Sequence, residues 1–221
     1  VDAQGRFCLY QSGTFHTIVD VEGFFSTAAV APSGSLFTPI APVRSVDTRN
    51  TPYCSSDGTC SDPAPVPPNT PIASTSASPV DAVAALADLT TLDTTTAGFL
   101  TADVCTNLNG GALSHSNVNF LAGDHAITNL GVVPTASTDL GAQFCTQSPT
   151  SQGLIVDVMG YFAPAAQGGL GYDTLAPQRL VDTRQCWTDP VTKVQRCGQI
   201  NTAGAVIRMS APPGASYVMA N

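Results

Sequence analysis

Glutamate and lysine are nearly missing from this sequence. Glu22 and Lys193 are the only examples among 221 residues. Both residue types favour helices, and since Thr, Ser, Gly, Pro and Val are abundant instead, the composition indicates strands joined by turns. The 16 acidic residues outnumber the 8 basic ones, which gives a formal charge of −8. The sequence has no basic cluster, which argues against nucleic acid and anionic membranes as partners.

Long apolar runs and catalytic motifs are also missing. No run approaches the ~20 residues that a membrane-spanning helix requires, so we predict no membrane insertion in this segment. The Gly-x-Ser-x-Gly and His-Glu-x-x-His patterns are absent, and His16, His115 and His125 form no arrangement of nucleophile, base and orienting acid. The sequence therefore predicts a protein that is not an enzyme and needs no cofactor.

The sequence also gives little support for a metal site. No Cys-x-x-Cys and no Cys/His spacing typical of zinc occurs. Asp is the hard-oxygen ligand that the chain has in quantity, which keeps calcium as an alternative, but no Asp-x-Asp-x-Asp loop is present. We predict no metal.

What the sequence does contain is an internal repeat. Ile18–Phe25 (IVDVEGFF) returns as Ile155–Phe162 (IVDVMGYF), 137 residues later. Pro42–Arg49 (PVRSVDTR) returns as Pro177–Arg184 (PQRLVDTR), 135 residues later and in the same order. Self-similarity at a fixed period is typical of an array of structural units.

The period divides the chain into one whole unit and two fragments. We expect residues 1–25 to be the C-terminal strands of a preceding repeat, 26–162 a complete repeat, and 163–221 the N-terminal part of a following one. Short runs of β-branched and aromatic residues recur between turn residues, as in sandwiches and barrels. The predicted fold class is all-β, with tandem, jelly-roll-like β-sandwich units of about 136 residues closed by disulfides.

The cysteines follow the repeat. Each Asp-Thr-Arg motif precedes a loop with two cysteines, and two more cysteines remain within the complete unit. Disulfides typical of an oxidising, extracytoplasmic compartment are the favoured interpretation, with buried free thiols or zinc ligands as the alternative. The expected pairs are Cys54–Cys60, Cys186–Cys197 and Cys105–Cys145.

The seventh cysteine, Cys8, corresponds to Cys145 because Phe7-Cys8 recurs as Phe144-Cys145. No counterpart of Cys105 precedes it, so we expect Cys8 to bond to a cysteine outside these 221 residues. Matching both ends to the period leaves about 50 residues of a unit missing between the end and the beginning of the chain. We expect each end to expose strand edges, unless the chain continues or another chain supplies strands.

Two features of the repeat are candidate sites. Asp47 with Arg49, and Asp182 with Arg184, place an acid and a base two residues apart on one face of a strand. They are either a binding or catalytic pair or, as we favour, a structural ion pair that fixes the strand end to the following loop.

The second candidate is the loop after each Asp-Thr-Arg motif. One loop presents Tyr53 and the other presents Trp187, the only tryptophan. Aromatic rings on disulfide-stiffened loops suit contact with glycans or a partner. The alternative is that each ring packs over its own disulfide.

Four motifs in fixed order resemble a known family. They are Pro-x-Arg-x-x-Asp-Thr-Arg, Ser-Asn-x-Asn-Phe at Ser116–Phe120, Asn129 in a Val/Ile-rich run, and Val-Asp-Val-x-Gly-Tyr/Phe-Phe. Together they resemble a repeat of large secreted and surface proteins of actinobacteria and related environmental bacteria. The resemblance implies a modular extracellular β-domain and carries no agreed activity.

These observations lead to three hypotheses of function. The first is a non-catalytic extracellular structural or adhesive repeat protein that forms a surface stalk, fibre or filament, with neighbouring repeats or copies of itself as partners. The second is a carbohydrate-binding module of a secreted or cell-wall-associated protein. The third is a fragment of a secreted hydrolase whose catalytic domain lies elsewhere. We favour the first.

Overall fold

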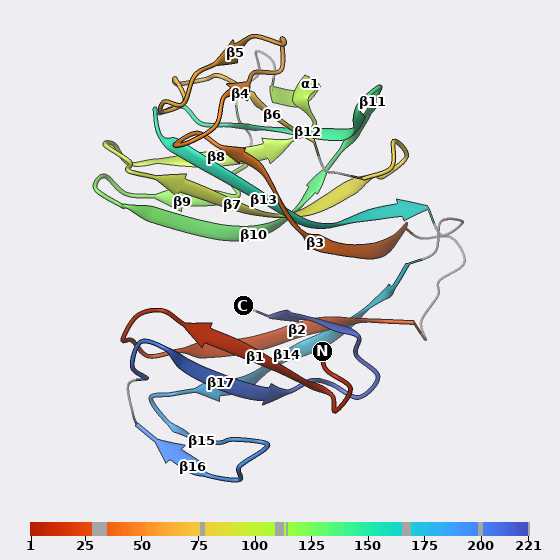
Figure 1. The fold of residues 1–221 in the computed structure, drawn as a ribbon, viewed down its shortest axis with the longest axis vertical. Helices are drawn as coiled ribbons and strands as arrows, with labels where there is room; N and C mark the ends of the chain where they lie inside the picture. The colour runs from red at the N-terminus through yellow and green to blue at the C-terminus, as the bar shows by residue number, and fades with distance from the viewer. Residues whose placement is uncertain are drawn as a thin grey trace. The chain divides into compact units, whose positions relative to one another are not determined.

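The chain folds into two compact units of β-strands (Figure 1). The computed structural model describes residues 1–27, 35–75, 78–108, 113, 115–164, 169–198 and 201–220. Residues 33–168 form one unit, here the contiguous unit, and residues 1–32 join residues 169–221 in the other, here the two-segment unit. The described part contains one short helix, α1 (Cys105–Leu108), and no helix long and apolar enough to cross a membrane.

The contiguous unit contains two main sheets, and all their strand pairs are antiparallel. The first has the order β10-β7-β13-β3, and the second the order β11-β12-β8-β9, with β6 also paired to β12. A short hairpin, β4–β5, follows β3. The strands are β3 (Ser35–Asp47), β4 (Tyr53–Cys54), β5 (Cys60–Ser61), β6 (Ile72–Thr75), β7 (Ala84–Leu92), β8 (Gly98–Asp103), β9 (Val118–Phe120), β10 (Ala126–Pro134), β11 (Ala136–Thr138), β12 (Gly141–Gln147) and β13 (Gly153–Pro164).

The core of this unit is made by side chains from both sheets. Val156 and Val158 on β13 are buried, whereas Asp157 between them lies on the other face, as the period of two in a strand requires. They belong to one cluster with residues of the second sheet, among them Ile72, Leu100, Ala102, Val118 and Phe144. The cluster therefore identifies the face of each sheet that is buried in the core.

A glycine near the end of β13 is needed for close packing. The register of β13 shifts at Gly160, and a Cβ at this position would collide with the ring of Phe37 on β3. Phe37 in turn contacts Phe162, with ring centroids 5.1 Å apart. A bulge with glycine therefore lets the aromatic pair close this end of the sheet.

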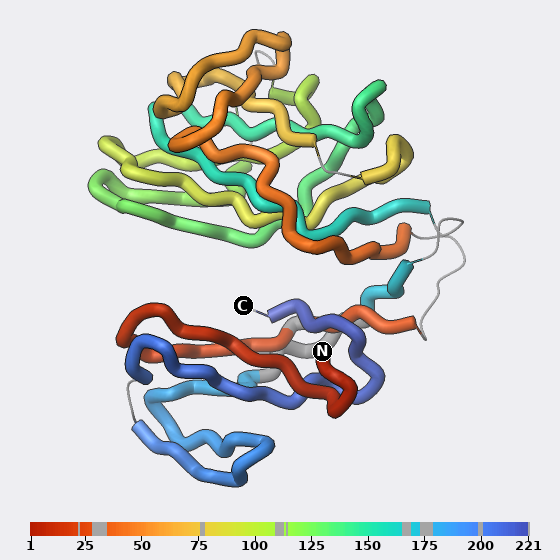
Figure 2. Tube along the Cα trace, viewed as in Figure 1, coloured from red at the N-terminus to blue at the C-terminus, as the bar shows by residue number. Residues whose placement is uncertain are grey.

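The two-segment unit combines strands from the two ends of the chain (Figure 2). One sheet has the order β14-β2-β18 and another pairs β1 with β17, while β15 and β16 form a hairpin. Its core cluster is Val19, Val181, Ile207 and Met209. The strands are β1 (Arg6–Gln11), β2 (Ile18–Ser26), β14 (Gly171–Asp182), β15 (Cys186–Thr188), β16 (Gln195–Cys197), β17 (Ala205–Ser210) and β18 (Tyr217–Ala220).

The expectation that each end of the chain exposes strand edges holds for β1, which is paired on one edge only in the described residues, but not for β2. β2 pairs with β14 on one side and with β18 on the other, so both of its edges are covered. The contiguous unit also runs to residue 168 rather than 162. The assignment of the two ends to a preceding and a following repeat stays a prediction.

Candidate functional site

The Asp-Thr-Arg motif forms a compact corner at the end of β3. Asp47 accepts hydrogen bonds from Arg49 at Nε (2.9 Å), Nη2 (2.7 Å) and the backbone nitrogen (3.2 Å). Arg44 adds a longer contact to Asp47, 3.2 Å from its Nη1. The Asp47 side chain is nearly buried, while both arginines are about half exposed. The corner therefore consists of a nearly buried carboxylate and two half-exposed guanidinium groups that contact it.

Arg44 also ties this corner to the neighbouring strand. Its Nε and Nη2 donate to the two oxygens of Asp157 on β13, at 2.9 and 2.8 Å. This bidentate geometry is the strong form of an arginine–carboxylate pair. One arginine thus links β3 to β13 and to the corner.

The same contacts are present in the two-segment unit. Arg184 donates to Asp182 from Nε (2.9 Å), Nη2 (2.8 Å) and its backbone nitrogen (3.0 Å). Arg179 binds both oxygens of Asp20 on β2, at 2.7 and 2.8 Å, and approaches Asp182 at 3.4 Å. The ion pair of each Asp-Thr-Arg motif is therefore part of a four-residue network rather than an isolated pair.

The threonine of the motif has a role that sequence reasoning missed. Thr48 is buried, its backbone nitrogen donates to the carbonyl of Leu154, and its hydroxyl accepts from the nitrogen of Leu154 at 2.9 Å. Thr183 makes the same two bonds with Thr17. The available signal was that Thr is retained between Asp and Arg in both copies of the motif.

The arginines control the charge state of these carboxylates. Hydrogen bonding from Arg49 holds the pKa of Asp47 well below its ordinary value, and Arg184 has the same effect on Asp182. A carboxylate that is ionised and occupied by several donors is not available as a general acid or base near neutral pH. This geometry suits a structural corner better than a catalytic pair.

A shallow, open cleft lies beside the Arg44–Asp157 pair. Pro42, Arg44, Asp88, Asp157 and Met159 line it. Asp88 stands directly opposite Asp157 in the sheet. Burial first, and then repulsion from Asp157, raise the pKa of Asp88. In this cleft Arg44 is bound to Asp157, and Asp88 lies beside that pair.

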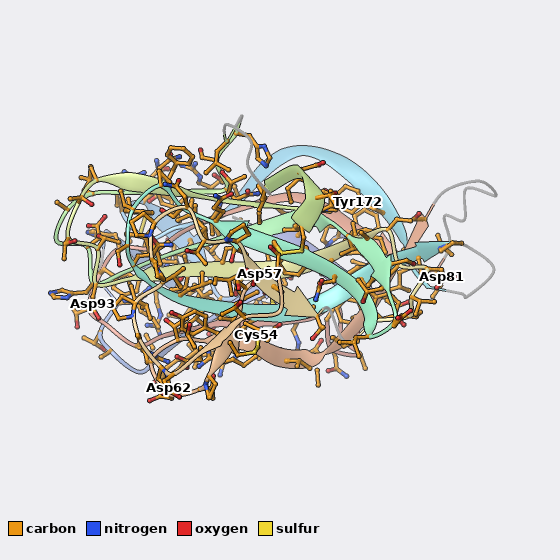
Figure 3. The ribbon with its side chains drawn as sticks, turned by 90° about the horizontal axis from the view of Figure 1, so that it is seen from above. Cys54, Asp57, Asp62, Asp81, Asp93 and Tyr172 are labelled. Atoms are coloured by element: carbon orange, nitrogen blue, oxygen red, sulfur yellow. A yellow bond between two sulfur atoms is a disulfide. The ribbon has the colours of Figure 1, made fainter. Side chains whose placement is uncertain are left out.

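Each Asp-Thr-Arg corner is followed by a hairpin with a disulfide across it. Cys54–Cys60 closes the β4–β5 hairpin, and Cys186–Cys197 closes β15–β16. In the first loop, Asp57 accepts from the Ser55 hydroxyl and from the nitrogen of Thr59. Cys54 and Asp57 on this loop, and Asp62 just after β5, are labelled in Figure 3. The disulfides stiffen two short hairpins, as the cysteine spacing predicts.

The two aromatic residues of these loops do not behave alike. Tyr53 is only 6% exposed and belongs to the core cluster with Val66 and Ile72, which leaves little of its ring open to a glycan or partner. Burial of the ring in this cluster removes a large apolar area from water. Trp187 is partly exposed and packs against the other core cluster, so it retains a surface that a ligand could touch.

The long disulfide, Cys105–Cys145, joins the start of α1 to β12. Cys145 is fully buried. Cys8 is a free, exposed thiol in the described part of the chain, and its expected bond to a residue outside these 221 stays a prediction.

The described residues contain no group of three His, Cys, Asp or Glu side chains that could hold a metal ion. Comparison of the chain with protein-family models, with curated proteins and with solved structures finds no match. The geometry defines a β-sheet protein with three disulfides, two of which close hairpins after the repeated arginine–carboxylate corners.

Proposed function

We propose that this chain is a non-catalytic, extracellular structural or adhesive repeat protein whose β-sandwich units assemble into a stalk, fibre or filament. The observation that carries the proposal is the corner made twice with matching contacts: the Asp47, Thr48 and Arg49 set and the Asp182, Thr183 and Arg184 set. The repeated feature is a set of stabilising contacts and not a reactive group. Such repetition is typical of an array of structural units.

The disulfides support the extracellular part of the proposal. Three cystines in one chain are typical of proteins that fold in an oxidising compartment. Two of them close loops of 6 and 11 residues, and such short cross-links hold local shape at an exposed surface. A surface loop whose shape is fixed by a disulfide suits a protein that acts outside the cell.

The sandwich architecture is supported by the mixed core. Residues of the β10-β7-β13-β3 sheet and of the sheet containing β12 and β8 share one apolar cluster. Two sheets packed through a common core are the basis of β-sandwich folds. In the two-segment unit, Val19 and Val181 share a cluster with Ile207 and Met209 of β17 in the same manner.

The test is whether the oxidised protein assembles without a ligand. We expect light scattering to show growth with protein concentration, and electron microscopy to show regular chains of units. Trp187→Ala, which alters the partly exposed ring, is expected to leave this assembly unchanged. A protein that stays monomeric at all concentrations and binds glycans on an array, with binding lost in Trp187→Ala, would contradict the proposal and favour a carbohydrate-binding module.

A further inference from the structure

Strand β1 has a partner on one edge only. It pairs with β17, with Cys8 opposite Arg208 and Leu9 opposite Ile207. In the described part of the chain no strand pairs with its other edge. β12 is the corresponding strand by sequence, and it is paired on both edges, with β6 and with β8. β1 therefore lacks the neighbour that β8 provides for β12.

The burial of matching residues shows the effect of that missing neighbour. On β12, Cys145, Thr146 and Gln147 are 0, 1 and 6% exposed. These are the three residues that pair with β8. Their counterparts on β1 are Cys8, which is exposed, Leu9, which is 38% exposed, and Tyr10, which is 67% exposed. The positions that β8 covers in one unit are the open positions in the other.

The Cys8 thiol lies where a strand paired with the open edge of β1 would place a cysteine. Asp103 of β8 is opposite Cys145, and Cys105, two residues further on, makes the disulfide. Cys8 occupies the position of Cys145 on β1 and is free. The open edge and the free thiol are separate observations that point to one kind of occupant.

We propose that the open edge of β1 binds an antiparallel strand from a further repeat. The sequence of this strand is similar to Gly98–Cys105, and its cysteine forms a disulfide with Cys8. The register expected from β12 and β8 places Cys8 opposite the Asp103 position, and Leu9 and Tyr10 opposite the positions of Ala102 and Thr101. Backbone hydrogen bonds would provide affinity, as in other cases of strand addition. The proposal rests on the repeat function above, because it names the partner of a repeat.

The covalent step is a thiol–disulfide exchange. The incoming strand carries its cysteine as a mixed disulfide with glutathione, and the Cys8 thiolate attacks the sulfur of that cysteine. The bond between the strand and glutathione breaks, the bond between Cys8 and the strand forms, and glutathione leaves as a thiolate. No net oxidation occurs.

The experiment uses the whole protein and a synthetic peptide of residues 98–108 (GFLTADVCTNL), supplied as its glutathione disulfide. The control peptide has the same composition with the cysteine at the same place and the other residues in scrambled order. In a glutathione buffer at equilibrium, we expect the matched peptide to be joined to Cys8 at least about tenfold more than the scrambled one. Peptide mapping identifies the joined cysteine, and Cys8→Ser provides the blank.

Hydrogen exchange gives a second measurement. Capture of the matched peptide is expected to slow exchange in β1, and not in the contiguous unit, because the new strand protects backbone amides of its open edge. Equal capture of both peptides, or capture without slower exchange in β1, would overturn the proposal and leave Cys8 as an ordinary exposed thiol. Cys8–Cys8 dimers in place of peptide capture would also overturn it and assign the edge to a second copy. Filaments formed without peptide capture would retain the proposed function while rejecting this partner.

Discussion

The contiguous unit and the two-segment unit build the same corner with different connectivity. In the contiguous unit the bond between Thr48 and Leu154 joins residues 106 apart, and in the two-segment unit the bond between Thr17 and Thr183 joins residues 166 apart in the opposite order along the chain. The bond lengths are 2.9 and 2.8 Å. A corner defined by strand pairing forms whether its strands follow in order or come from the two ends, because register, and not loop length, brings the groups together.

The units differ in how completely their second sheet is built. β12 has neighbours on both edges and a disulfide to α1, whereas β1 has one neighbour and a free cysteine in the described residues. The arginine network is alike in both units, although in the described residues the first sheet has four strands in the contiguous unit and three in the two-segment unit. Comparison of the two units therefore separates two contributions to stability. One comes from the corner, and the other from a second sheet whose central strand is paired on both edges.

The largest expected difference comes from a matched pair of core truncations. Phe144→Ala removes a fully buried ring and is expected to destabilise the contiguous unit by about 3–5 kcal/mol. Phe7→Ala, at the corresponding position of β1, removes a ring that is only partly buried and is expected to cost clearly less in its own unit. Urea titration followed by hydrogen exchange, read separately for peptides of each unit, measures both. Equal costs would mean that β1 is as well covered as β12.

Removal of the long disulfide is expected to act on one unit only. Cys105→Ala combined with Cys145→Ala opens a loop of 40 residues, which in the chain-entropy model lowers stability by about 3–4 kcal/mol. The same titration is expected to show this loss in the contiguous unit and no change in the other. Cys8→Ser, which breaks no bond within the described chain, is the control. A loss in both units would show that they unfold together.

The corner threonines are expected to give equal effects in the two units. Thr48→Val and Thr183→Val keep the shape of the side chain and remove its hydroxyl, which leaves a backbone N–H without its acceptor. Each change is expected to destabilise its own unit by about 1–2 kcal/mol. Thr96→Val, in an exposed turn, is the control and is expected to be neutral. If only one threonine matters, the corner does not have the same role in both units.

Acidification is expected to give the smallest difference. The lowered pKa values of Asp47 and Asp182 mean that both corners contribute stability above the ordinary carboxyl pKa of about 4 and lose it as the pH falls further. The raised pKa of Asp88 has the opposite sign: its contribution is complete below about pH 4 and is lost as the pH rises through its folded pKa.

The contiguous unit should therefore gain stability relative to the other unit as the pH falls from neutral toward the ordinary carboxyl pKa of about 4, and the gain is expected to be small because Asp88 is partly solvated. Thermal melts followed by hydrogen exchange over this range provide the measurement. Asp88→Asn is expected to abolish the gain, and a gain that persists in that variant would assign it to another group.

Local features of the fold could be predicted from the sequence. The alternation in Val156-Asp157-Val158 gave the buried face of β13, and cysteines 6 and 11 residues apart gave the two hairpin disulfides. The prolines of β3 do not interrupt the sheet, since β3 is one strand from Ser35 to Asp47. β3 lies at the edge of its sheet, where the missing N–H of Pro39 or Pro42 removes no ladder bond that a neighbour needs.

The sequence by itself determined the strand-rich composition, the short disulfides and the pairing of Asp47 with Arg49, because each depends on residues close together in the chain. Only the tertiary structure decided that Tyr53 turns into the core, that Thr48 bonds to Leu154, and that the two ends of the chain meet in one unit. These outcomes depend on which distant strands become neighbours. Side-chain patterns fix the face of a strand, but the neighbour on each edge is chosen by backbone pairing and by the apolar surface left to bury.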